Sequence, residues 1–486
     1  MGLSEIAGLP KYHMISAPGF FVPEIRQAHK RGRSHRGNIT GKGSSSMHRI
    51  LCPSIIAKAF RLLFLCALIL FLNGCVAMQR APEQSLQPPV PMQNEIERNV
   101  FSVADGDDVI GTLAVVRLDN GDTLPDIARH FGLGINAISA ANPGVDVWVP
   151  EPGKEIILPL SFILPDAPRK GIVINLATMR LFRFKEDSKG QVVSTYPVGV
   201  GTAERPTPTG KMRVERKTAL PTWYVPASIA EDHKKKGDLL PAKVPPGPEN
   251  PLGERALYLS KAGYLIHGTN KPASIGLKAT NGCLRLYPEN VMTLYEETPV
   301  NTPVLIVSQP YLVGERDGVV YLEAHAPLEN SGAQELEKVT AKLRKLEKKY
   351  GRNLDWKKIG KVQAEARGVP VPIMVFGAGN AKDSVKTVNV ERPLRIFGAP
   401  EVPELRLDAW YVLAANVGHE IEARRLAAII NHQGPPIPAR VLPQGSNSYH
   451  VIAGPFDNVG VAKEAVRRLK LDLELNGILI DPVKKI

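Results

Sequence analysis

The sequence predicts a multidomain protein that contains a small α+β module, a mainly-β domain and a C-terminal α+β unit. A chain of 486 residues is longer than one compact domain usually is. Residues 165–310 hold β-branched runs separated by glycine and proline, with few helical periods. Residues 406–483 contain a strand–helix pattern that occurs twice. These three observations divide the chain into separately folded units.

The positive charge of the chain is concentrated at its start. The formal net charge is +13, and residues 1–61 hold ten Lys/Arg against two Glu, which places +8 of it there. The remaining +5 is an ordinary solvated surface. A nucleic-acid interface needs basic and aromatic residues interleaved on one face, and the rest of the chain does not supply them. We therefore expect no nucleic-acid partner.

A secretory leader is predicted over residues 47–74. Basic residues follow Met47, an 11-residue apolar run spans Leu62–Leu72, and Asn-Gly-Cys comes next. The run is shorter than the roughly 20 residues of a membrane span. The tail LNGCV resembles a bacterial lipobox, which implies lipidation of Cys75. Because a leader should open a chain, residues 1–46 are expected to be an extension from a misplaced translation start.

The cysteines then single out one thiol. Cys52 and Cys66 would leave with the leader and Cys75 would be capped by lipid, so Cys283 stays as the only free thiol. In an oxidising compartment an unpaired cysteine is either buried and inert or used chemically. Residues 75–112 are polar and proline-bearing and are expected to be a tether.

The α+β module is predicted over residues 113–160. A strand leads into a turn at Asn120-Gly121-Asp122, apolar residues then recur at helical spacing, and a strand closes the segment before Pro159. The runs GDTLPDIARHFG, ANPGVD and PGKEIILP resemble a LysM module. That resemblance implies a βααβ fold that binds glycans containing N-acetylglucosamine, such as peptidoglycan.

The mainly-β domain contains a histidine and the free cysteine in HGTNKPASIGLKATNGCLRL. A free thiol is mostly protonated at neutral pH, so acyl transfer would need a base beside it and donors for an oxyanion. His267 lies 16 residues before Cys283, which leaves enough chain for a loop to fold back. Gly268 and Gly282 permit close backbone approach. An inert, buried Cys283 is the alternative reading.

This segment resembles the signature of YkuD-type L,D-transpeptidases, in which a histidine precedes [S/T]-x-G-C. Three further runs fit the resemblance: PTPTG at 206–210, PTW at 221–223 and NPLG at 250–253. The resemblance implies Cys283 as nucleophile and His267 as base, with the Gly268 carbonyl holding the imidazole tautomer. It also implies no cofactor, and the chain shows no metal-ligand cluster.

The resemblance assigns the remaining site residues to the oxyanion and the substrate. The backbone of Gly282 and Cys283 would form the oxyanion site, and Arg285 would lie near substrate carboxylates or organise the site. Thr280 and Asn281 complete the motif, although many relatives have histidine where this chain has Asn281. We expect that change to alter a secondary contact only.

The activity that follows is peptidoglycan L,D-transpeptidation. The cysteine would cleave the diaminopimelate–D-alanine bond of a tetrapeptide stem and pass the acyl group to an amine, giving a 3→3 cross-link or an anchored protein. Two alternatives stay open: a carboxypeptidase or amidase that uses water, and a non-catalytic wall-binding scaffold. His233 lies among three lysines and is expected to be a solvated loop residue.

The C-terminal part is expected to hold a helix and linker over 311–405 and a repeat unit over 406–483. Residues 334–350 combine charged residues with an apolar stripe. The second repeat, YHVIAGPF at 449–456, resembles the signature of a SPOR domain, which implies a ferredoxin-like unit that binds peptidoglycan strands stripped of stem peptides.

The leader and the wall-binding modules together predict a periplasmic protein with a lipid anchor. Val76 gives no inner-membrane retention signal of the aspartate type, so the outer membrane is favoured. The SPOR resemblance implies, in addition, a location at the division septum. The expected partners are peptidoglycan, the membrane and, as acceptor, an outer-membrane protein.

Overall fold

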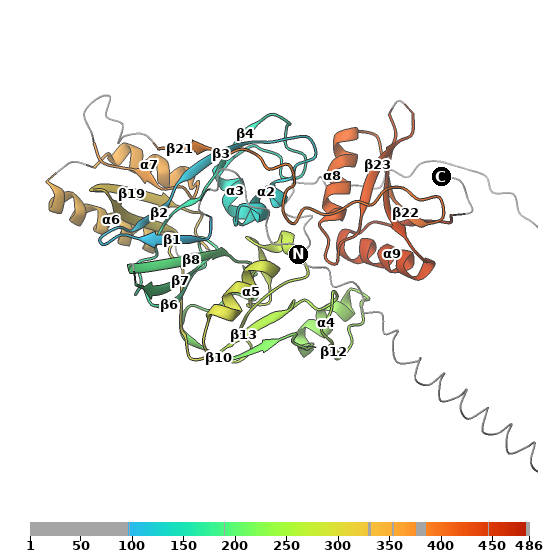
Figure 1. Ribbon diagram of the computed structural model, residues 1–486, viewed down its shortest axis with the longest axis horizontal. Helices are drawn as coiled ribbons and strands as arrows, with labels where there is room; N and C mark the ends of the chain where they lie inside the picture. Colours follow the sequence, from blue (N-terminus) through green and yellow to red (C-terminus); the bar gives the residue numbers. More distant parts are fainter. Residues whose placement is uncertain are drawn as a thin grey trace, which may run out of the picture. The chain divides into compact units, whose positions relative to one another are not determined.

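A computed structural model gives the structure of the protein (Figure 1). The expected extension (1–46), the leader and Cys75 lie outside the described residues. No helix among the described residues is long and apolar enough to cross a bilayer. The described residues are 96, 98–188, 190–328, 332–351, 354–375, 385–445 and 447–482.

The N-terminal module, residues 113–160, contains two strands and two helices. Its order is β3 (Leu113–Arg117), α2 (Leu124–His130), α3 (Ile135–Ala141) and β4 (Glu155–Leu158). The Thr123 side chain caps α2, and a proline occupies the first turn, where its missing N–H costs nothing. Strands β3 and β4 pair antiparallel.

The central domain, residues 165–310, is built on a nine-stranded mixed sheet. Helix α5 (Pro288–Glu297) packs on one of its strands, β13. Short strand pairs, β9 (Val200–Gly201) with β15 (Lys278–Thr280) and β11 (Trp223–Tyr224) with β12 (Lys243–Val244), extend the loops. In sheet order the nine strands are β1 (Val100–Val103), β8 (Gly190–Pro197), β7 (Arg180–Asp187), β6 (Gly171–Asn175), β17 (Pro303–Val307), β10 (Gly210–Ala219), β13 (Arg255–Leu259), β14 (Leu265–His267) and β16 (Leu284–Arg285).

The expected tether, 75–112, must be shortened at its C-terminal end. Strand β1 forms an edge of the nine-stranded sheet by pairing with β8, and β2 (Val109–Gly111) pairs with β5 (Ser161–Ile163). Alternate residues of β1, Phe101 and Val103, are buried while their neighbours are exposed. That period-2 pattern is too short to stand out from a polar segment.

The expected helix and linker, 311–405, is also corrected, because most of its first part is folded. Strands β18 (Tyr311–Arg316), β19 (Val319–Ala324) and β20 (Val371–Pro372) form a sheet, with α6 (Gly332–Tyr350) against β18 and α7 (Trp356–Glu365) against β19. They enclose a separate core whose buried members include Val320, Leu322, Val339, Leu343, Ile359 and Met374.

The second part of the expected linker is attached to the N-terminal module. Strand β21 (Thr387–Asn389) pairs parallel with β3. Farther along, Arg392 donates two hydrogen bonds to the carboxylate of Asp122, at 2.8 and 2.6 Å. A bidentate arginine–carboxylate pair with a buried acid fixes both partners. Residues 387–392 therefore run along the module as a strap.

The C-terminal unit has a four-stranded sheet and two helices. The first repeat is β22 (Trp410–Val417) with α8 (Glu420–Asn431), and the second is β24 (Tyr449–Phe456) with α9 (Val459–Leu473). The sheet order is β23-β24-β22-β25, in which β23 (Ala439–Pro443) was not expected and β25 (Ile478–Ile480) closes the unit.

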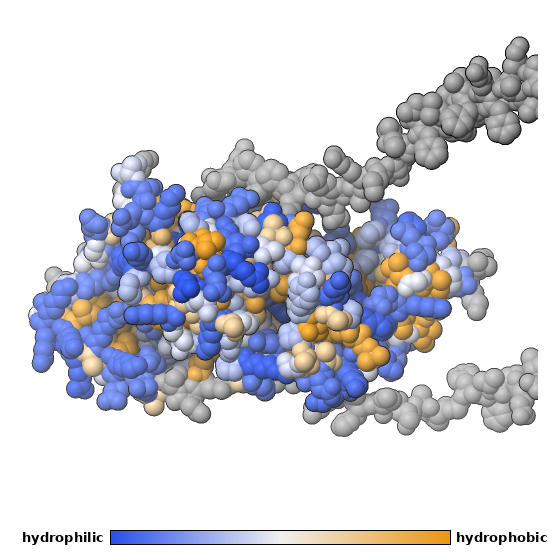
Figure 2. Space-filling model, turned by 90° about the horizontal axis from the view of Figure 1, so that it is seen from below, coloured by the Kyte–Doolittle hydropathy of each residue, from blue (hydrophilic) through white to orange (hydrophobic). Residues whose placement is uncertain are grey.

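The N-terminal module and the central domain share one hydrophobic core. Phe131 and Ile138 of the module belong to the same buried cluster as Phe182 and Val193 of the large sheet. Burying such side chains stabilises by about 1.5–3 kcal/mol each, so the two units support one another. On the face shown in Figure 2, apolar residues occur as separate patches among polar ones.

Candidate functional site

His267 ends strand β14, and Cys283 directly precedes β16, the neighbouring strand at the edge of the large sheet. Strands β14 and β16 pair parallel, with Ile266 opposite Leu284 and His267 opposite Arg285. Paired residues of adjacent strands lie on the same face of a sheet, so Arg285 lies on the face of His267. Because side chains alternate along a strand, Cys283, two residues before Arg285, lies on that face as well. Chain folding therefore brings Cys283 to the strand that carries His267.

The imidazole of His267 is buried and held in one tautomer. Its Nδ1 lies 2.7 Å from the Gly268 carbonyl oxygen. Since a carbonyl only accepts, Nδ1 carries the proton of the neutral ring, and the ring lone pair lies on Nε2. Burial, together with the charge of Arg285, lowers the pKa of His267 to about 3, although hydrogen bonds to the carbonyls of Gly268 and Leu252 oppose this shift. The imidazole is neutral at pH 7.

The thiol of Cys283 is also uncharged at rest. Its Sγ donates to the Gly263 carbonyl at 3.6 Å, and the residue is partly buried. Burial raises the pKa of the thiol, although a backbone hydrogen bond from Leu265 and the charge of Arg285 oppose this. The resting pair is thus a neutral thiol and a neutral imidazole, with the S–H directed at a backbone oxygen.

The turn before Cys283 is fixed by hydroxyl groups. Thr280 Oγ1 donates to the Cys283 carbonyl at 2.6 Å and accepts from the Gly282 N–H at 3.1 Å. Thr207 donates to the Gly282 carbonyl at 2.9 Å. Gly282 has φ +100°, and a Cβ there would come within 2.9 Å of the Tyr264 ring. Only glycine fits, because the φ is left-handed and the space is filled.

The two N–H groups expected as oxyanion donors differ in their hydrogen bonding. The Gly282 N–H, expected as one donor, is already used by Thr280 within the turn. The Cys283 N–H makes no hydrogen bond to any other residue that the structure describes. Of the two expected donors, the Cys283 N–H is therefore the one without a hydrogen-bond partner among the described residues.

Arg285 supplies a positive charge without a carboxylate partner among the described residues. Its Nη1 donates to Ser274 Oγ at 3.3 Å, and its buried Nε has no hydrogen-bond partner there. Burial lowers the pKa of its guanidinium. A buried donor that stays unpaired costs about 1–3 kcal/mol, so this group is suited to a ligand that brings an acceptor.

Arg205 joins the turn before Cys283 to a helix, and no sequence motif marks this residue. Its guanidinium donates to Asn281 Oδ1 at 2.6 Å and to Asp232 Oδ2 at 2.5 Å. Asp232 lies on α4 (Ala227–Lys235), which has no buried residue. Arg205 is thus the link between this exposed helix and the turn that carries Cys283.

His233, expected to be a solvated loop residue, lies on α4. Its Nδ1 is 2.8 Å from Asp238 Oδ2, and the side chain is 43% exposed. It makes no hydrogen bond or ion pair with Cys283 or with His267. It is therefore not part of the site that the two strands build.

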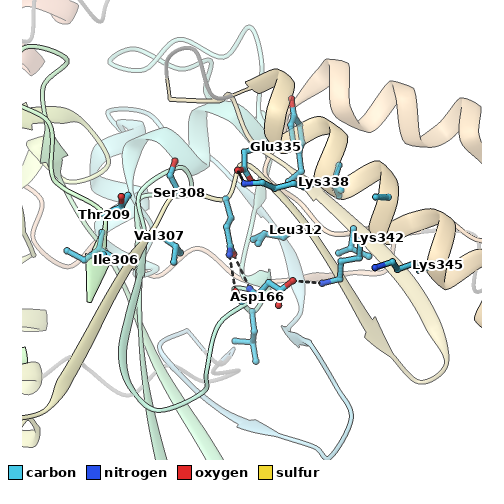
Figure 3. Close-up of a pocket in the computed structure, with 17 residues that line it drawn as sticks. Asp166, Thr209, Ile306, Val307, Ser308, Leu312, Glu335, Lys338, Lys342 and Lys345 are labelled. Carbon is cyan, nitrogen blue, oxygen red and sulfur yellow. Dashed lines mark hydrogen bonds and ion pairs between the residues drawn. The ribbon is translucent and has the colours of Figure 1, made fainter. Parts of the chain in front are cut away.

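A large open cavity lies elsewhere, between the central domain and α6 (Figure 3). Its volume is about 890 Å³. Lys342 is paired with Asp166, and Lys338 with Glu335, so most of its charge is neutralised. Cys283, His267 and Arg285 do not line it. Among the described residues, moreover, no three His, Cys, Asp or Glu side chains cluster as metal ligands would.

The burial of His267 predicts a loss of stability in acid. Its folded pKa is about 3, against about 6.5 for a free imidazole, so between these pH values only the unfolded chain takes up the proton. Stability therefore falls as pH falls through this window, by about 2.5 kcal/mol at pH 4.5. Between pH 7 and 4.5, the free energy of unfolding measured in urea should therefore fall by about 2.5 kcal/mol less for His267→Gln than for the wild type. Equal losses in the wild type and in His267→Gln would contradict the prediction.

Comparison with protein families identifies three segments. Residues 169–306 match the L,D-transpeptidase catalytic domain (YkuD), residues 119–159 the LysM domain and residues 407–480 the SPOR domain. These matches coincide with the central domain, the N-terminal module and the C-terminal unit.

Individual relatives extend the likeness beyond the central domain. The chain is 39% identical to the probable L,D-transpeptidase ErfK/SrfK of Escherichia coli over 234 residues, 47% of this chain and 74% of that protein. It is equally identical to the probable L,D-transpeptidase YbiS of Escherichia coli, over 76% of that protein. The catalytic domain of the Enterococcus faecium L,D-transpeptidase, solved by NMR, aligns with 29% of this chain and 99% of its own at 21% identity and a TM-score of 0.22. On the sequence relationships, this chain belongs to the L,D-transpeptidase family and is an enzyme of that kind.

Proposed function

We propose that the protein is a peptidoglycan L,D-transpeptidase in which Cys283 is the nucleophile and His267 the general base. The observation that supports this most directly is the parallel pairing of β14 with β16, because β14 ends at the neutral, tautomer-fixed imidazole and the thiol directly precedes β16. A base that is unprotonated at pH 7 can take the thiol proton as the sulfur attacks.

The proposed first half-reaction forms a thioester. The thiol turns from the Gly263 carbonyl toward His267 Nε2, its proton passes to the imidazole, and the sulfur attacks the carbonyl at the L-centre of diaminopimelate in a tetrapeptide stem. The oxyanion accepts a hydrogen bond from the Cys283 N–H. When the carbon–nitrogen bond breaks, D-alanine takes the proton from the imidazolium, and the acyl group stays on sulfur.

The second half-reaction restores the thiol. An amine attacks the thioester, its proton goes to His267, and the sulfur leaves and is protonated in turn. A second diaminopimelate gives a 3→3 cross-link, and a lysine of an outer-membrane protein gives an anchored protein. Water would give a carboxypeptidase instead. We infer that Arg285 receives a carboxylate of the stem, because its buried guanidinium lacks one.

The flanking modules support a peptidoglycan substrate. LysM and SPOR domains bind peptidoglycan, and one stands on each side of the catalytic domain in the sequence. Two weak contacts on one chain raise the local concentration of substrate. We propose further that the protein works in the periplasm, anchored by lipid on Cys75 in the outer membrane and enriched at the septum.

The proposal is tested with purified tetrapeptide muropeptides and mass spectrometry. Loss of one D-alanine with the appearance of a dimer means cross-linking, and loss without a dimer means hydrolysis. Addition of a lysine-terminated peptide tests the protein acceptor by formation of an adduct. If the purified wild-type protein releases no D-alanine, the proposed function is wrong.

Arg205 should matter for turnover although it does not touch the reacting atoms. The change Arg205→Gln removes the link between α4 and Asn281, so the turn before Cys283 gains freedom. We expect kcat/KM to fall roughly tenfold, since small displacements of a nucleophile are costly, and amide exchange in α4 to rise. Arg183→Gln, which removes a comparable arginine–glutamate pair to Glu297, is the control and should leave turnover unchanged. Equal kcat/KM in both variants would disprove the role of Arg205.

A further inference from the structure

The LysM domain contacts the loop that separates His267 from Cys283. The Ile135 N–H donates to the Ile275 carbonyl at 3.1 Å. A Cβ on Gly134 would lie 3.1 Å from Gly276 Cα, and a Cβ on Gly276 would lie 2.6 Å from the Ile135 nitrogen. The start of α3 and this loop therefore touch backbone to backbone, with no room for a side chain between them.

The same loop is connected to the active site on its other side. Ser274 Oγ accepts from Arg285 at 3.3 Å. The Gly276 N–H donates to the Val198 carbonyl at 3.2 Å, and the Leu277 carbonyl accepts from β9 at 3.0 Å. Loop 271–278 is thus clamped between the LysM helix and the strand segment beside the catalytic turn.

A second LysM contact holds the chain just after Cys283 and Arg285. The hydroxyl of Tyr287 donates to the Leu133 carbonyl at 3.0 Å. Arg129 donates twice to Glu289, at 3.0 and 2.8 Å, and both side chains are largely buried. Two charge-assisted bonds in this fork geometry fix position as well as charge.

We propose that Arg129, Leu133, Gly134 and Ile135 of the LysM domain are positioning residues for the transpeptidase. They hold the segments on both sides of Cys283, so the LysM domain supports the geometry of the nucleophile in addition to binding glycan. The inference rests on the proposed role of Cys283. It differs from the usual view of a tethered module, whose removal from the catalytic unit would change substrate capture and leave turnover of a soluble peptide intact.

The first test is Gly134→Ala in the full chain. Gly134 has φ −90°, so alanine brings no backbone strain and only pushes on Asn136 and Gly276. On a soluble, glycan-free tetrapeptide we expect kcat to fall about tenfold while KM stays within about twofold. The matched control is Gly418→Ala, where a Cβ meets nothing and φ lies outside the left-handed region.

The second test uses the Arg129–Glu289 pair and does not depend on the glycine contact. Arg129→Gln and Glu289→Gln should each lower kcat, and the double variant should lower it no further than the worse single one, because residues of one pair are not additive. The rate at which iodoacetamide alkylates Cys283 should also differ from the wild-type rate in these variants. Sedimentation with peptidoglycan should match the wild type.

The outcomes separate this inference from the proposed function. If wild type turns over the tetrapeptide and Cys283→Ala does not, the proposed function holds. If Gly134→Ala and Glu289→Gln then keep the wild-type kcat, the positioning role is wrong. A change confined to sedimentation, with kcat and alkylation unaltered, would also overturn it, because the LysM domain would then act through glycan binding alone.

Discussion

Replacement of Cys283 by alanine is expected to abolish release of D-alanine from tetrapeptide muropeptides, with a fall in rate of at least about 10³-fold. Without the sulfur no thioester forms, so the reaction cannot proceed through two easier steps. Neither His267 nor the backbone N–H of residue 283 can replace the nucleophile. Mass spectrometry of the muropeptides, together with intact-protein mass spectrometry of the enzyme, measures both effects. Wild type trapped early in the reaction should gain the mass of the acyl group, and Cys283→Ala should not.

Cys283→Ser is the control for folding. A hydroxyl keeps a donor toward the Gly263 carbonyl, so the turn should stay intact. The serine variant should melt within a few degrees of the wild type and still bind tetrapeptide, yet turn it over far more slowly, because the buried hydroxyl is a much weaker nucleophile. Release of D-alanine by Cys283→Ala at the wild-type rate would show that another group carries the reaction.

The sequence predicts the roles of Cys283 and His267 because their chemistry restricts the alternatives. One free thiol in a chain expected to be secreted, with a histidine 16 residues upstream and glycines beside both, is a small set of candidates. The strand register that brings the start of β16, just after Cys283, beside His267 cannot be predicted from spacing, since it depends on β14 and β16 being neighbours. The use of the Gly282 N–H by Thr280 is likewise a matter of turn geometry.

The hydrogen bonds of Arg205 and the contacts of the LysM domain cannot be predicted from the sequence, for the same physical reason. Arg205 is 76 residues from Asn281, and Arg129 is 160 residues from Glu289. Each pair forms only after the sheet is assembled, and single charged residues carry no periodic signal. A strand prediction over 311–405 is weak because β18 and β19 have only six residues each, β20 has two, and Gly314 interrupts the apolar run of β18. Within this part of the chain, the sequence predicts only the apolar stripe of α6, where Val339 and Leu343 are buried.

Replacement of His267 by glutamine is expected to lower kcat/KM by about 10²–10⁴-fold at pH 7, the usual contribution of a positioned general base. Glutamine roughly keeps the shape but accepts no proton near neutral pH, so the thiol must ionise before it attacks. Because burial raises the pKa of Cys283, that thiolate is scarce at pH 7. The rate of the variant should therefore rise with pH through the neutral and mildly alkaline range.

The wild type should show a different pH profile. The pKa of His267 is about 3, so the imidazole stays neutral down to weak acid, and kcat/KM should not fall through its protonation between pH 7 and 5. Measurement of kcat/KM on the soluble tetrapeptide from pH 5 to 9 distinguishes the two proteins, with His233→Gln as a control that follows the wild type. A wild-type profile that falls with an apparent pKa near 6.5 would mean that the imidazole is solvated during turnover. A His267→Gln variant with the same slope as the wild type would mean that the base is another group.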